Sequence, residues 1–135
     1  MNDLGCDVPQ IRERLVRART ELEHHLREGI MPFWTKRAID ERYGGYFTCF
    51  DAEGRLDEAD TDKHIVTQTR LIWGFSTFHM IDPQDQVFLA YARQGVDFFI
   101  EHFWDTRHGG WAWKVARDGM LIDNGKVVYG QSFAI

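Results

Sequence analysis

Histidines are the residues of this chain whose type most directly suggests acid–base or metal chemistry. Two metal ligands on one helix are usually four residues apart, and no two histidines here have that spacing. The chain also shows no CxxC pair, Ser/His/Asp order or glycine-rich phosphate loop. The histidines are His24, His25, His64, His79, His102 and His108. We therefore expect no metal site, and only His64, near the start of a predicted inner helix, is a candidate site residue.

A single arginine interrupts the most apolar stretch of the chain. Arg70 lies within residues 63–80, a predicted helix whose apolar residues cover most of its circumference. A buried charge is costly without a partner. Arg70 is therefore either a structural residue paired with a carboxylate, for which Asp62 and Asp97 are candidates, or a ligand-binding group. The residue pattern leaves both interpretations open.

The N-terminal part of the chain has the spacing of a long amphipathic helix. Apolar residues recur every three or four positions over residues 11–38, opposite a face rich in Arg and Glu. Asp7 is a start signal for this helix, and Pro32 is expected to kink its last turns. We expect an outer helix, with one side facing solvent.

Two further helices are predicted from their spacing and their start signals. Residues 63–80 follow three polar side chains at 60–62 that are suited to N-capping, and their apolar circumference predicts an inner helix enclosed by others. Residues 82–103 begin with Asp82 as N-cap and Pro83 as the first helical residue. Their one apolar face predicts a second outer helix.

Two short β-hairpins are predicted on the helix connections, at residues 44–56 and 109–119. Each opens with a Gly-Gly pair and contains a turn glycine. The two regions form an internal repeat, which predicts an all-α helical toroid with short hairpins on its connections. The matching pairs, offset by 65 or 63 residues, are Gly44 and Gly109, Gly54 and Gly119, Lys63 and Lys126, and Gln68 and Gln131.

Composition excludes several classes of protein. The net charge is −5 with no basic stripe, which argues against a nucleic-acid partner. Cys6 and Cys49 have neither disulfide-framework nor metal spacing, so two free thiols in a reducing cytoplasm are expected. We expect no membrane partner, because the chain shows no signal peptide and no apolar run of about 20 residues.

The ordered motifs of the chain resemble the N-acylglucosamine 2-epimerase and cellobiose 2-epimerase superfamily. The motifs are Ile30-Met31-Pro32-Phe33-Trp34, Tyr43-Gly44-Gly45-Tyr46, Asp62-Lys63, Gln68-Thr69-Arg70-Leu71-Ile72-Trp73, Arg107-His108-Gly109-Gly110 and Tyr129-Gly130-Gln131-Ser132-Phe133-Ala134-Ile135. The resemblance implies an (α/α)6 barrel. Residues 1–135 would form its N-terminal part, about two of six helix-pair repeats, and would stop within the fourth helix.

The resemblance also implies a carbohydrate epimerase or isomerase that needs no cofactor. Members epimerise N-acylglucosamine or cellobiose at C2, or isomerise mannose, by removing the C2 proton to give an enediolate. The two histidines that act as acid and base would lie beyond Ile135, so no catalytic residue is expected within this chain. Arg70 and Tyr129 match substrate-binding positions of the family, and Gln131 and His64 are further substrate-binding candidates.

Five questions stay open at the level of sequence. The chain alone is expected to be inactive and marginally stable or self-associating, so an inactive truncated fragment or sugar-binding remnant is one alternative. Another is an (α/α)6-barrel glycoside hydrolase or lyase with Asp60 and Asp62 as its carboxylate pair. The choice of sugar, epimerisation against aldose–ketose isomerisation, and a homodimer are not decided by the residues.

Overall fold

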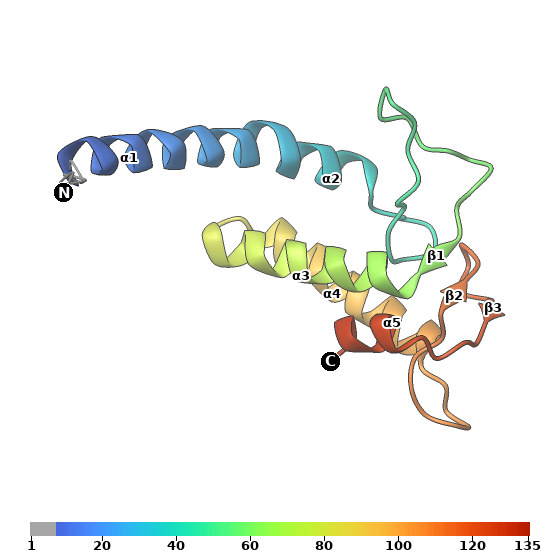
Figure 1. Cartoon of the computed structure of the whole chain (residues 1–135). Coiled ribbons are helices and arrows are strands. Elements are labelled where there is room, and N and C mark those ends of the chain that lie inside the picture. Colours follow the sequence, from blue (N-terminus) through green and yellow to red (C-terminus); the bar gives the residue numbers. More distant parts are fainter. Residues whose placement is uncertain (1–7) are drawn as a thin grey trace. The chain divides into compact units, whose positions relative to one another are not determined.

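A computed structural model describes residues 8–135 of the chain, so the predicted helix start at Asp7 lies outside the described residues (Figure 1). The chain divides into two compact units, Met1–Thr35 and Lys36–Ile135. No helix among residues 8–135 combines the length and the apolar character that crossing a membrane requires.

The first unit is helical throughout its described part, as its spacing predicts. Helix α1 spans Val8–His25, a π-helical turn η1 spans Leu26–Ile30, and α2 spans Met31–Arg37. Pro32 explains the irregular turn, because its ring clashes with the carbonyl of the residue four positions earlier and it has no N–H to donate. The chain relaxes by widening the preceding turn, where the Met31 N–H bonds to the Leu26 carbonyl.

Two long helices pack along each other in the second unit. They are α3, Ile65–Ile81, and α4, Gln86–Phe103 (Figure 1). The predicted start of α4 is wrong by about three residues: Asp85 is its N-cap and accepts from the Val87 N–H at 3.0 Å. Asp82 instead ends α3, where its N–H bonds to the Phe78 carbonyl, and so it cannot also begin α4.

The predicted N-cap of α3 is also wrong. His64 holds the cap position with extended backbone and no side-chain hydrogen bond. The carboxylates at 60–62 have other partners, since Asp60 accepts from the Cys49 thiol at 3.4 Å and Asp62 pairs with Lys114 at 2.6 Å. Because Asp60 and Asp62 bond to these partners, neither side chain caps the start of α3.

A small three-stranded antiparallel sheet joins the two repeats. Its order is β1 (Lys63–His64), β2 (Lys114–Val115) and β3 (Leu121–Asp123), and β2 with β3 forms the predicted second hairpin. The first predicted hairpin is reduced to isolated bridges, one of which joins Phe50 and Leu56. The fold is therefore mostly helical, with β1 linking the start of α3 to the second hairpin.

Aromatic side chains from α4 dominate the core of the second unit. The central cluster comprises Ile65, Phe98, Phe99, Phe103, Ala112 and Val115. Tyr46 is fully buried against α4, where its hydroxyl donates to the Tyr91 carbonyl at 2.9 Å. A side chain at Gly95 would collide with the Tyr46 hydroxyl, so this glycine permits the close approach.

The internal repeat reappears as one hydrogen-bonding scheme used twice. In the first repeat, the Gln68 amide accepts from the Tyr46 N–H at 2.9 Å and donates to the Tyr46 carbonyl at 2.8 Å. In the second repeat, Gln131 makes the same two bonds to Trp111 at 2.9 and 2.8 Å. Helix α3 and the short helix α5, Val128–Phe133, are thereby each fixed to the chain that follows a Gly-Gly turn.

An aspartate and a lysine complete the scheme in each repeat. Lys63 donates to Asp40 at 3.1 Å, and Lys126 lies 3.1 Å from Asp105. Each aspartate also accepts backbone N–H groups of its own turn, those of residues 42–43 and 107–108. We call each of these pairs an Asp–Lys clamp.

Candidate functional site

Arg70 and Tyr129 meet on a surface shared by α3 and the short helix α5, Val128–Phe133. The Arg70 Nη2 donates to the Tyr129 hydroxyl at 3.1 Å. The guanidinium also lies over the Phe133 ring, 4.7 Å from its centroid, and that ring meets Tyr129 edge to face at 5.0 Å. The structure therefore brings together the two residues that the sequence matches to substrate contacts.

Arg70 is exposed, contrary to the expectation that other elements enclose the helix that carries it. Neither predicted carboxylate partner is used: Asp62 pairs with Lys114, and Arg70 forms no ion pair with Asp97 or any other carboxylate described in residues 8–135. A fixed, accessible guanidinium is suited to binding an oxygen-rich ligand. The Phe133 ring and the Tyr129 hydroxyl hold it in place without neutralising its charge.

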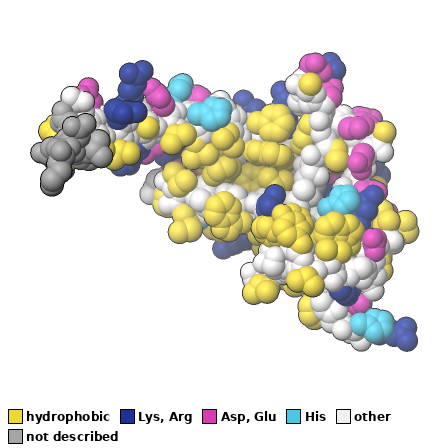
Figure 2. Space-filling view, viewed as in Figure 1, with side chains coloured by type: hydrophobic (Ala, Val, Ile, Leu, Met, Phe, Trp, Pro, Cys, Tyr) yellow, Lys and Arg dark blue, Asp and Glu magenta, His cyan; other side chains and the backbone are white. Residues whose placement is uncertain are grey.

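His64 lies at the same end of α3 as Arg70 and is half-buried. Its ring meets Trp113 edge to face with the centroids 6.2 Å apart. Trp113 also borders Gly130 of α5, where an added side-chain carbon would lie 2.7 Å from Ile65. Gly130 therefore lets α5 approach α3 closely. Apolar side chains gather over these two helices (Figure 2).

Gln131 faces the hairpin and not Arg70. Its amide oxygen and nitrogen are both bonded to the Trp111 backbone. Substrate binding by Gln131 stays a prediction, but its observed bonds fix α5 to the preceding turn. Gln68 likewise fixes α3 to the turn before it, through its two bonds to the Tyr46 backbone.

Sequence reasoning missed the Asp–Lys clamps. Lys63 and Asp40 are fully buried, and Arg117 joins them by donating to both carboxylate oxygens of Asp40 at 2.9 and 3.2 Å. One signal was available, because Asp40 and Asp105 are separated by the same 65 residues as the Gly-Gly pairs. The pairing partners and the burial follow only from the three-dimensional structure.

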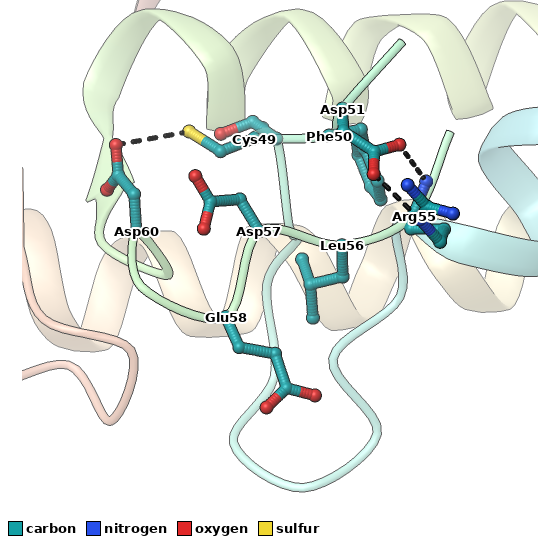
Figure 3. A pocket seen from close by; sticks show the side chains of 9 residues that line it. Cys49, Phe50, Asp51, Arg55, Leu56, Asp57, Glu58 and Asp60 are labelled. Carbon is teal, nitrogen blue, oxygen red and sulfur yellow. Dashed lines mark hydrogen bonds and ion pairs between the residues drawn. The ribbon is translucent and has the colours of Figure 1, made fainter. Parts of the chain in front are cut away.

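An open pocket lined by residues 48–51, 55–58 and 60 lies beside the first hairpin (Figure 3). Burial is the largest cause of the raised pKa of Cys49, and its hydrogen bond to Asp60 raises it further. The thiol is therefore protonated near neutral pH and is not an activated nucleophile. Cys49 is free, as expected, whereas Cys6 lies outside the described residues.

The carboxylates described here are not arranged for metal binding or for paired acid–base work. Within residues 8–135, no three His, Cys, Asp or Glu side chains are grouped so that they could hold a metal ion. Asp60 and Asp62 are engaged with Cys49 and Lys114, respectively. This gives the hydrolase alternative no support from geometry.

The clamp aspartates have lowered pKa values. Burial alone raises the pKa of Asp40, but hydrogen bonds from Arg117 and Lys63 outweigh burial and hold it below its ordinary value. A hydrogen bond from Asn124 and one from the His108 backbone N–H lower the pKa of Asp105 well below its usual range. Both groups therefore favour the folded state when they are ionised.

We expect the chain to lose stability on acidification. An unfolded aspartate has a pKa of about 4, so below that pH the unfolded state binds protons before the folded state does. The stabilisation by Asp40 and Asp105 is present above about pH 4 and is lost as the pH falls through their folded pKa values. Thermal unfolding measured across this range tests it, with Asp105→Asn expected to show a shallower dependence. An unfolding midpoint that does not change with pH would contradict the prediction.

The chain is similar to known proteins over most of its length. Residues 45–135 match the family described as N-acylglucosamine 2-epimerase. The chain is 33% identical over 110 residues to a cellobiose 2-epimerase from Eubacterium cellulosolvens, covering 82% of this chain and 26% of that relative. It is also similar to the solved cellobiose 2-epimerase from Spirochaeta thermophila, with a TM-score of 0.82, 29% identity and coverage of 92% of this chain and 30% of that one.

A solved D-mannose isomerase shares the fold, with a TM-score of 0.65 at 18% identity, covering 76% of this chain and 27% of that one. The chain spans less than a third of the length of each of these relatives. The comparisons therefore concern the segment that carries Arg70 and Tyr129, and not a whole enzyme.

Proposed function

The chain belongs to the N-acylglucosamine 2-epimerase family, and from this premise we propose that it is the N-terminal part of an (α/α)6-barrel sugar 2-epimerase. The observation that carries the proposal is the hydrogen bond between Arg70 and Tyr129 on the accessible surface of α3 and α5. In such a barrel this surface forms one wall of the sugar cavity. The residues beyond Ile135 supply the other walls.

The proposed reaction begins with an open-chain aldose. A base removes the proton from C2, and the electron pair forms the C1–C2 double bond of an enediolate with negative charge on O1. Return of a proton to the opposite face of C2 gives the epimer. Return to C1, together with transfer of the O2 proton to O1, gives a ketose. Arg70 donates to the oxygens near C1 and C2 and stabilises the developing charge, while the Tyr129 hydroxyl fixes the guanidinium and contacts the sugar.

We propose that two histidines beyond Ile135 act as the acid and the base, and that the reaction needs no metal or cofactor. His64 and Trp113 would border the sugar without exchanging its proton. The charge of −5 and the lack of a basic stripe support a small neutral substrate over nucleic acid. A cytoplasmic location and a homodimer remain parts of the proposal.

Isotope incorporation tests the proposed function. The gene product that contains this chain is incubated in heavy water with cellobiose, N-acetylglucosamine or mannose, and the products are followed by NMR. Deuterium at C2 of the epimer supports a 2-epimerase, and ketose formation indicates the isomerase instead. Glucose released from cellobiose would show a hydrolase and overturn the proposal. Residues 1–135 alone are expected to give no turnover.

A further inference from the structure

The start of α5 lacks the usual device for fixing a helix. Its N-cap residue Val127 makes no side-chain hydrogen bond, and α5 is only six residues long. Its first turn nevertheless carries Tyr129, whose hydroxyl must meet Arg70 across the gap between two helices. Something other than capping has to set the position of this turn.

Two side-chain tethers lie on either side of Tyr129. Lys126, three residues before it, pairs with Asp105 at 3.1 Å. Gln131, two residues after it, is bonded at both ends of its amide to Trp111. Both anchors belong to the turn region that follows α4, where Asp105 and Gly110 are joined by a backbone hydrogen bond, so Tyr129 lies between two tethers to one hydrogen-bonded segment.

Asp105 is suited to act as an anchor. Its side chain is 9% exposed, and it accepts the backbone N–H groups of Arg107 and His108 at 3.0 and 3.1 Å. Asn124 donates to it at 2.8 Å, so the chain on the α5 side is attached twice. The hydrogen bonds within its own turn therefore hold the carboxylate in place independently of Lys126.

The first repeat uses the same arrangement for the helix that carries Arg70. Lys63 and Gln68 tether the start of α3 to Asp40 and Tyr46. Arg70 follows Gln68 by two residues. The two partners of the candidate site thus depend on equivalent tethers in the two repeats.

We propose that Lys126 and Asp105 form a positioning pair that sets Tyr129 against Arg70 and Phe133, with Gln131 as the second tether. The effect of this pair on catalysis rests on the proposed function, because Tyr129 would contact the sugar. The placement of Tyr129 by the pair does not depend on that function. The pair acts through the placement of Tyr129 and touches no substrate itself.

The test is NMR of the full chain with labelled tyrosine rings. The chain has four tyrosines, and the Tyr129 signal is assigned by its loss in Tyr129→Phe. In Lys126→Met, we expect the Tyr129 ring signal to move and its cross-peak to the Phe133 ring to fall to less than half. Lys126→Arg should leave the Tyr129 signal and its cross-peak to Phe133 as they are in the unsubstituted chain, because it keeps the charge that pairs with Asp105. The other three tyrosines should not change.

Lys114→Met is the matched control. Lys114 is a half-exposed lysine of the same repeat that pairs with a carboxylate, Asp62, away from the Asp105 turn. It should leave the Tyr129 signal in place. An unchanged Tyr129 in Lys126→Met would overturn the inference, and so would equal changes at all four tyrosines, which would show a general structural role. No sugar is turned over in this measurement. The positioning role can therefore be wrong while the epimerase proposal is right, and the epimerase proposal can be wrong while the positioning role is right.

Discussion

Replacing Arg70 with alanine is expected to lower kcat/KM for sugar epimerisation by roughly 10²–10³-fold, the cost of losing one preorganised donor to a developing oxyanion. The reason is geometric: the guanidinium is held by the Tyr129 hydroxyl at 3.1 Å and by the Phe133 ring, and it has no carboxylate partner among residues 8–135. Its charge is therefore available to the substrate. Steady-state kinetics of the gene product that contains the chain measures the effect.

Arg70→Lys should recover little of this activity. A lysine has a point charge on a flexible side chain. It lacks the planar set of donors with which a guanidinium can bond to the Tyr129 hydroxyl and to a substrate oxygen at the same time. Arg93→Ala is the control, because Arg93 is an exposed arginine on α4, away from Tyr129, that lines an open pocket with Tyr43 and Asp97. Equal losses in Arg70→Ala and Arg93→Ala would contradict a specific role for Arg70.

Helix positions could be predicted from the sequence more accurately than helix starts. The spacing of apolar residues reports which face is buried, and that face is set by the whole helix. A start depends on where one or two polar side chains find partners. Asp62 bonds to Lys114, which comes from a hairpin 52 residues later, and such competition is invisible in a local pattern.

The candidate site was predictable residue by residue but not as an arrangement. The motifs indicate Arg70 and Tyr129 separately, while their contact depends on how closely α5 approaches α3. That distance is set by Gly130 against Ile65 and by the tethers at Lys126 and Gln131. The exposure of Arg70 was not expected, because the apolar circumference of α3 suggested a helix enclosed on all sides.

Asp40→Ala is expected to be the most destabilising single change in the second unit, costing about 3–5 kcal/mol of unfolding free energy. Asp40 and Lys63 both have side chains that are fully buried, so removing the carboxylate leaves a buried ammonium without its counter-charge. The substitution also frees Arg117 and the backbone N–H groups of residues 42–43. Urea unfolding followed by circular dichroism gives the free energy.

Asp105→Ala is the matched control, because Asp105 accepts the two equivalent backbone N–H groups, those of residues 107–108, in the second repeat. The difference is that Lys126 is 30% exposed and can turn to water when its partner is lost, whereas Lys63 cannot. The double variant Asp40→Ala/Lys63→Met should recover part of the lost stability, since it removes the stranded charge together with its partner. If Asp40→Ala were no more destabilising than Asp105→Ala, burial would not be what distinguishes the two clamps, and Lys63 would have to reach water in the folded chain.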